Sequence, residues 1–259
     1  MMTRAAANPA NWLCAMVFGS AAWGSAAMAE GLIEAAISGE RIPADRAQDS
    51  WRKPHEVLHF LEIAPDHHVL DFYAGPGYYS ELLSRIVGPA GRVLIYNNEL
   101  YAQAAHNGLT TRLARDRLPN AKAINAPSNY LKLEAASLDR VLIVLTYHDI
   151  YWQPYDAPGP MGDPNKVLAI LRAALKPNGL VVVVDHIANP TAQQDITAVA
   201  SRLHRIDPQV VRADFQRAGF VFVEESDTLR QVGDDHTKSV FDASVRHNTD
   251  QFMYKFRRP

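Results

Sequence analysis

The stretch HVLDFYAGPGYYSELL, residues 68–83, decides the fold. It predicts a buried strand that holds Asp71 near its end, a turn with Gly75 and Gly77, and an amphipathic helix after the turn. In open sheets built from such units, ligands bind beyond the carboxyl ends of the strands, beside the first strand. The turn is therefore the predicted ligand site.

The rest of the chain repeats this alternation of strand and helix. Further strands are predicted at residues 91–96, 121–125, 138–147, 180–186, 220–225 and 250–256, and helices at 54–64, 110–118, 166–178 and 208–218. The first five strands alternate with helices, which indicates an α/β fold with a doubly wound, mostly parallel, Rossmann-like sheet of seven strands. The last two strands have no helix between them, so they are expected to form an antiparallel hairpin.

The N-terminal segment is typical of a cleaved secretory signal. Arg4 precedes an apolar stretch that fades into small residues and ends in Ala27-Met28-Ala29. We expect cleavage after Ala29, a periplasmic or secreted mature protein, and no stable membrane insertion after cleavage. Residues 1–29 would then be the signal peptide, and the mature chain would have no cysteine, because Cys14 is removed.

Residues 30–259 are expected to form one domain. Its first part, residues 30–64, is predicted as a helical lid, and residues 150–165 as an insert rich in aromatic residues and proline. The chain has 259 residues, 47% of them apolar, and a net charge of −2 without basic blocks. This composition argues against a nucleic-acid-binding protein, which usually carries a clustered positive surface. A small-molecule substrate is the expected partner.

Asp71 distinguishes between two ligands that such a turn could hold. Residues 75–80 supply only two of the three glycines of the NAD fingerprint. A carboxylate at position 71 would repel the pyrophosphate of NAD, whereas it suits a positively charged ligand such as S-adenosylmethionine. A dehydrogenase is therefore the less favoured alternative.

The segment VLDFYAGPGYYS resembles motif I of class I S-adenosylmethionine-dependent methyltransferases, whose seven-stranded sheet also ends in an antiparallel hairpin. Other segments resemble a narrower group of methyltransferases of unclear substrate, often with a signal peptide: RKPHEVLHFL, TYHDIYW, LKPNGLVVVVDH, LHRIDPQVVRADFQRAGF and TDQFMYKFRRP. The resemblance implies methyl transfer from S-adenosylmethionine to a small-molecule acceptor. It also implies that Asp71 holds the methionine end of the cofactor, and that Gly75 and Gly77 let the backbone approach it.

The second predicted strand departs from the family pattern at its end. The family normally places an acid there to bind the ribose hydroxyls, but this chain has Asn97, with Glu99 two residues later. An amide can bind two hydroxyls but lacks the charge, so Asn97→Asp is expected to keep or tighten cofactor binding. The adenine would lie near one of three residues after the third strand, Asn125, Ser128 or Asn129.

Catalytic groups are expected after the fourth and fifth strands, beside the cofactor. In TYHDIYW, His148 is the best general-base candidate because histidine titrates near neutrality. Asp149 could orient it or bind the substrate, and Tyr147 is the third catalytic candidate, an alignment group together with Asp149 if no base is needed. His186 and His204 are weaker candidates. Asp149, Asp185 and His186 could converge, but no spacing supports a metal site, and none is predicted.

The predicted compartment leaves a rival hypothesis open. S-adenosylmethionine is made inside cells, so an exported enzyme has no evident supply of it. The alternative is an exported binding module that retains the methyltransferase fold without turnover. The aromatic insert suits a cap over an aromatic or cationic small molecule, or a packed surface loop.

Overall fold

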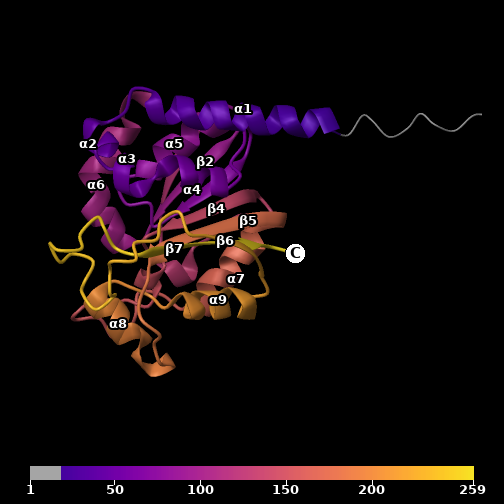
Figure 1. The fold of residues 1–259 in the computed structure, drawn as a ribbon. Coiled ribbons are helices and arrows are strands. Elements are labelled where there is room, and N and C mark those ends of the chain that lie inside the picture. The colour runs from indigo at the N-terminus through magenta and orange to yellow at the C-terminus, as the bar shows by residue number, and fades with distance from the viewer. Residues whose placement is uncertain (1–18) are drawn as a thin grey trace, which may run out of the picture.

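The computed structural model describes residues 19–259, which form a seven-stranded sheet between two layers of helices (Figure 1). Across the sheet the strands follow the order β3-β2-β1-β4-β5-β7-β6. Neighbours among the first five strands are parallel, and β7 runs antiparallel to both β5 and β6. The strands are β1 (His68–Phe72), β2 (Arg92–Asn97), β3 (Ala121–Asn125), β4 (Leu138–Val144), β5 (Leu175–His186), β6 (Val221–Ser226) and β7 (Gln251–Arg257). The predicted mostly parallel, doubly wound sheet is confirmed.

Alternating side chains of the strands face two separate cores. Val69 of β1 packs in the core beneath α1, α4 and α5, whereas its neighbour Leu70 packs in the core formed with α7, α8 and α9. This alternation is what a strand buried on both faces requires. The helices are α1 (Gly19–Ser38), α2 (Pro43–Arg46), α3 (Asp49–Arg52), α4 (Pro54–Phe60), α5 (Tyr78–Val87), α6 (Glu99–Leu113), α7 (Pro164–Ala174), α8 (Ile196–Leu203) and α9 (Pro208–Arg217).

The helix predicted over 166–178 ends earlier than expected. α7 ends at Ala174, and β5 already begins at Leu175, which pairs with Leu138 of β4. Pro177 explains the difference, because proline has no N–H and its ring would clash with the carbonyl of residue 173 in a helix. The prediction of Leu175 as a helical core residue was therefore wrong, although its side chain is buried.

The two C-terminal strands are antiparallel as predicted, but no tight turn joins them. Residues 227–250 connect β6 to β7, and this long segment, drawn in yellow tones in Figure 1, folds back toward the carboxyl ends of the parallel strands. α8 is a further element that the sequence did not predict. Both features shape the site described below.

Side chains near the C-terminal end of the N-terminal helix pack on the domain. Ile33 and Ala36 are buried against α4 and α5, whereas Met28 is 61% exposed. Residues 1–18, with Arg4, Cys14 and the apolar stretch of the expected signal, lie outside the described residues. Within the described chain, none of the helices has the length and apolar character needed to cross a membrane.

Candidate active site

A cavity of about 510 Å³ lies at the carboxyl ends of β1, β4 and β5. Its volume falls in the range of small-molecule sites, roughly 300–1,000 Å³. The walls come from α3, the β1–α5 turn, α6, the ends of β4 and β5, and the β6–β7 connection. The cavity therefore lies where the doubly wound topology places ligands, beside the first strand.

Asp71 lies at one end of the cavity, and its side chain is almost fully buried. Its Oδ2 accepts a hydrogen bond of 2.6 Å from the Ser80 hydroxyl of α5. Burial raises the pKa of Asp71 to about 6, although the bond from Ser80 and the charge of Arg52 act in the opposite direction. A buried carboxylate without a directly bonded cation favours a positively charged ligand.

The two glycines of the turn have different roles. Gly75 lines the cavity with a φ of +56°, and a Cβ added to it would meet no atom within 4 Å, so the backbone presents an open side there. Gly77 has a φ of +84° and caps α5, and a Cβ there would come within 3.0 Å of the Arg112 side chain. Gly75 thus lies at the cavity, whereas Gly77 permits the turn and the close packing behind it.

Asn97 lies behind the turn and does not line the cavity. Its Oδ1 accepts a hydrogen bond of 2.9 Å from the backbone N–H of Gly75, and its Nδ2 donates one of 3.0 Å to the carbonyl of Gly75. The amide is buried, and both its oxygen and its nitrogen form a hydrogen bond. Asn97 therefore holds the glycine turn in place, and these contacts do not support the expectation that a carboxylate here would keep or tighten cofactor binding.

Asn97→Asp is instead expected to lower the free energy of unfolding by about 1–3 kcal/mol, the cost of leaving a buried polar group unsatisfied. The substitution removes the donor to the Gly75 carbonyl and places a carboxylate oxygen against it. Urea denaturation measures this loss. Asn107→Asp, on the part of α6 that is exposed, is the matched control and should change little. Unchanged stability of Asn97→Asp would show that the amide does not hold the turn.

The other residues predicted to contact the nucleoside are also placed away from the cavity. Glu99 is exposed at the first turn of α6, Ser128 shares a hydrogen bond with the Tyr73 hydroxyl, and Asn129 accepts one from the backbone of Asp163. Asn125 lines a separate, smaller pocket. The structure does not bring these four side chains together. Tyr73 and Tyr101, which do line the cavity, stack at 4.8 Å and form this part of its wall.

His148 and Asp149 also line the cavity, in a short 3₁₀ turn after β4. Asp185, at the end of β5, accepts a hydrogen bond of 2.8 Å from His148 Nδ1 and another of 2.8 Å from the His148 backbone N–H. The Nε2 atom of the same ring is 3.3 Å from Asp149 Oδ1. The ring is thus fixed between two carboxylates, and Tyr101 donates a hydrogen bond to the second one.

The two carboxylates change the protonation of His148. Burial alone would lower its pKa, but Asp149 and Asp185 outweigh burial and raise the pKa of His148 to about 9. The two carboxylates therefore favour the protonated form of the imidazole, in which it cannot act as a base. The general-base expectation for His148 rested on an ordinary histidine pKa and took no account of this pair of carboxylates.

Of the three other candidates for catalytic residues, Tyr147 lies in the core, whereas His186 and His204 lie at the cavity. Tyr147 is fully buried in the core beside α9, where its hydroxyl donates a hydrogen bond to Asp214, so it does not reach the cavity. His186 and His204 do line the cavity. His186 Nδ1 lies 2.7 Å from the Thr249 hydroxyl, and burial holds the pKa of this histidine well below its usual value.

No family model and no curated protein matches the chain, but solved structures match most of its length. An S-adenosylmethionine-dependent methyltransferase from Aquifex aeolicus is 16% identical and superposes with a TM-score of 0.55, covering 82% of this chain and 98% of that one. One from Mesorhizobium loti is 14% identical with a TM-score of 0.53, covering 82% and 100%. Phosphoethanolamine N-methyltransferase 2 from Haemonchus contortus, in complex with S-adenosylmethionine, is 13% identical with a TM-score of 0.54, covering 80% and 52%. The chain has the class I methyltransferase fold.

Two segments far from the strands in the sequence border the cavity of this methyltransferase fold. Trp51 and Arg52 of α3 line it, as do Phe241 and His247 of the β6–β7 connection. The rings of Trp51 and His247 approach to 4.5 Å between centroids. The predicted lid at 30–64 contributes three side chains, those of Gln48, Trp51 and Arg52. Sequence reasoning missed residues 227–250, which carry no hydrophobic periodicity that could have placed them here. Of the predicted aromatic insert, only Trp152 and Met161 reach the cavity.

Proposed function

We propose that the protein is an enzyme that transfers a methyl group from S-adenosylmethionine to a small-molecule acceptor. The observation that carries this proposal is the buried Asp71 at the glycine turn, in a fold shared with S-adenosylmethionine-dependent methyltransferases. The same cavity holds the polar wall of His148 and Asp149. One cavity thus offers a place for a cationic cofactor and another for an acceptor.

The charges at the Asp71 end fit the methionine part of the cofactor. That part carries an ammonium, a sulfonium and a carboxylate, so its site needs groups of both signs. Asp71 supplies the negative charge, and Arg52 of α3 supplies a positive one at the same end. Arg52 is held by a hydrogen bond of 2.8 Å to Gln48 and lies over the rings of Trp51 and Tyr78. These contacts leave its charge fixed next to the cavity.

The wall beyond the turn suits the nucleoside part. Tyr73 and Tyr101 form a stacked pair, and apolar side chains of Leu100, Ala104 and Met161 continue the wall. Of the described residues that line the cavity, only Asp71 and Asp149 are carboxylates, so the ribose would have no acid of the usual kind. We infer that Asp71 and the aromatic wall contribute most of the affinity.

The bound cofactor would supply a methyl group on a sulfonium, which is already a good leaving group. The protein would then have to exclude water and align the acceptor with that methyl group. Contacts such as that between Trp51 and His247 cover the cavity, and Trp152, Phe241 and Tyr79 give it aromatic walls. The polar edge formed by His148 and Asp149 would orient the acceptor against them. An aromatic small molecule with a polar substituent fits this lining best.

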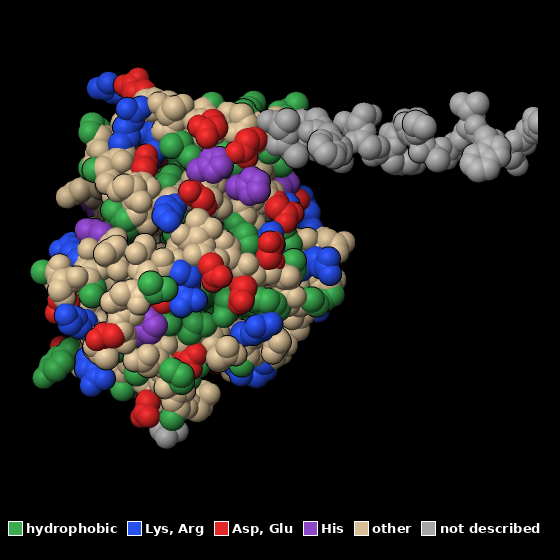
Figure 2. Space-filling model, viewed as in Figure 1, with side chains coloured by type: hydrophobic (Ala, Val, Ile, Leu, Met, Phe, Trp, Pro, Cys, Tyr) green, Lys and Arg blue, Asp and Glu red, His purple; other side chains and the backbone are tan. Residues whose placement is uncertain are grey.

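The charges on the face of the described chain shown in Figure 2 are mixed in sign. On the face shown in Figure 2, acidic and basic side chains are interspersed over the helices and loops. Such a mixed surface supports a small-molecule acceptor. The acceptor can be found by incubating the protein and S-adenosylmethionine with pools of small molecules and detecting the methylated product by mass spectrometry.

We further propose that the mature enzyme begins at Glu30, outside the cytoplasm. The packing of α1 supports this boundary, because its buried residues Ile33 and Ala36 follow the proposed cleavage site, as does the contact of 2.6 Å between Glu30 and His55 Nε2. Cleavage after Ala29 would leave these contacts intact.

Full-length protein expressed in a bacterium with a Sec pathway is expected outside the cytoplasm, shortened and beginning at Glu30. N-terminal sequencing of the purified protein checks this directly. An Ala29→Arg variant, which alters the small residue at the cleavage site, should accumulate uncleaved. Soluble wild-type protein in the cytoplasm that retains Met1 or Met2 would refute export and remove the question of cofactor supply.

A further inference from the structure

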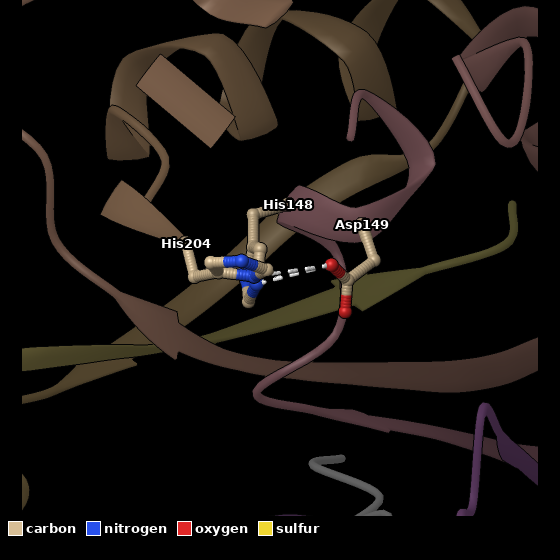
Figure 3. Close-up of side chains that lie close together, drawn as sticks. All are labelled: His148, Asp149 and His204. Atoms are coloured by element: carbon tan, nitrogen blue, oxygen red, sulfur yellow. Dashed lines mark ion pairs between the residues drawn. The ribbon is translucent and has the colours of Figure 1, made fainter. Parts of the chain in front are cut away.

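Three potential metal-ligand atoms converge on one wall of the cavity (Figure 3). His148 Nε2 lies 3.3 Å from Asp149 Oδ1, and His204 Nδ1 lies 3.6 Å from the same oxygen. All three ligand atoms are within 4.8 Å of one another. Figure 3 shows the two imidazole rings directed at the carboxylate from different elements, the turn after β4 and the end of α8.

These separations are those of ligands that share one small metal ion. Bonds of about 2.0–2.2 Å to nitrogen and oxygen, arranged tetrahedrally, place neighbouring ligand atoms about 3.3–3.6 Å apart. The two separations from Asp149 Oδ1 agree with this geometry. The three groups therefore need little rearrangement to bind an ion between them.

A second layer of hydrogen bonds fixes two of the three groups. Asp185 is completely buried and lies 2.8 Å from His148 Nδ1, so that Nε2 of the same ring is directed at Asp149. Tyr101 donates a hydrogen bond to Asp149 Oδ2, which leaves Oδ1 directed at both histidines. A carboxylate behind a histidine, with a hydrogen bond to the outer oxygen of a carboxylate ligand, is the arrangement that orients ligands in metal sites.

The types of the ligand atoms indicate which metal ion would bind, and their position indicates that the ion would lie at the cavity. Two imidazoles and one carboxylate suit zinc, iron, cobalt or manganese better than magnesium or calcium, which prefer oxygen ligands. His148, Asp149 and His204 all line the cavity, so the remaining coordination positions would face its interior. Metal sites with three protein ligands and an open position bind substrate or water there.

We propose that His148, Asp149 and His204 bind one divalent first-row transition-metal ion, with its open positions facing the cavity. Binding of the ion itself does not depend on methyl transfer. The consequence for the acceptor does rest on the proposed function: an acceptor with an oxygen or nitrogen donor could coordinate the ion. The polar wall would then select acceptors by their ability to bind a metal.

Titration with Co²⁺ tests the site, because cobalt bound by histidine and carboxylate absorbs visible light. Full-length protein stripped with a chelator should develop this absorption and saturate at one equivalent of Co²⁺, and added Zn²⁺ should remove it. His204→Asn removes one ligand while keeping a residue that tolerates the left-handed backbone at φ 53°. It should weaken Co²⁺ binding at least about 100-fold, and Asp185→Asn about 10–100-fold.

His55→Gln is the matched control. His55 belongs to the other group of potential ligands in the described chain, Glu30, Glu34 and His55, which lies on the surface. Its substitution should leave the spectrum and stoichiometry unchanged. Circular dichroism confirms that each variant is folded. Absence of saturable binding at one equivalent, equal affinity in folded His204→Asn, or loss of the signal in His55→Gln would each overturn the proposal. Because Asp71 is not one of the proposed ligands, cofactor binding by metal-free protein tests the proposed function separately.

Discussion

Asp71→Asn is expected to bind S-adenosylmethionine at least about 100-fold more weakly than the wild type, the effect of losing a charged hydrogen bond in a buried site. The carboxylate lies at the cavity with its Oδ2 bonded to Ser80, and its charge has no directly bonded cation among the described residues. The amide keeps the shape and can still bond to Ser80, but it cannot offset the positive charge of the ligand. Calorimetric titration with S-adenosylmethionine measures the loss.

The same substitution should not weaken the fold. Burial raises the pKa of Asp71 from 3.8 to about 6, so the ionised carboxylate is less favourable in the folded protein than in the unfolded chain. Wild-type stability is therefore lost as the pH rises between these values. The neutral amide avoids this loss, and the free energy of unfolding at pH 7 should stay equal or rise by up to about 3 kcal/mol. Urea denaturation at pH 7 checks it.

Two comparisons make the Asp71 result specific. Wild-type affinity for the cofactor should fall as the pH drops below about 6, because Asp71 then takes up a proton, and Asp71→Asn should lack this dependence. Glu99→Gln, which removes an exposed carboxylate outside the cavity, should bind like the wild type. Undiminished affinity in folded Asp71→Asn would refute the assignment of the glycine turn as the cofactor site.

His148→Gln is expected to lower the turnover of an identified acceptor by about 100-fold or more, the usual cost of misplacing a reacting group by about 1 Å. The ring is fixed between Asp149 and Asp185 and has no hydrogen bond to Asp71 among the described residues, so its loss should disturb the acceptor and leave cofactor affinity little changed. Steady-state kinetics together with cofactor calorimetry separate the two effects.

His186→Gln provides the comparison for His148. His186 also lines the cavity, but its Nδ1 lies beside Thr249, away from the Asp149 carboxylate. Its substitution should reduce turnover less. If His148→Gln turned over the acceptor at nearly the wild-type rate, alignment would have to come from the aromatic walls, including Trp152 and Phe241.

The fold could be predicted from the sequence because its central strands are buried on both faces. The run of β-branched residues Val181–Val184 is typical of a central strand of a parallel sheet. The glycine turn at Gly75 comes shortly after the end of β1 at Phe72. The carboxyl ends of β1 and β4 meet at one edge of a parallel sheet, so Asp71 and His148 could be assigned to one site from the sequence, and both line the same cavity.

The sequence pattern could not predict in which direction a side chain points or which distant segments come into contact. Asn97 occupies the expected end of β2, but its amide turns toward the Gly75 backbone. The protonation of His148 depends on Asp185, which is 37 residues away and reaches it only because β4 and β5 are neighbours. His204 comes to the same wall through α8, an element that the sequence pattern did not reveal.

Calorimetric titration of the purified mature protein with S-adenosylmethionine, and with S-adenosylhomocysteine as the product form, tests the central claim most directly. We predict saturable binding of both ligands at one equivalent per chain, and binding of S-adenosylmethionine at least about 100-fold weaker in Asp71→Asn. A folded wild-type protein that binds neither ligand would contradict the account, whatever its fold.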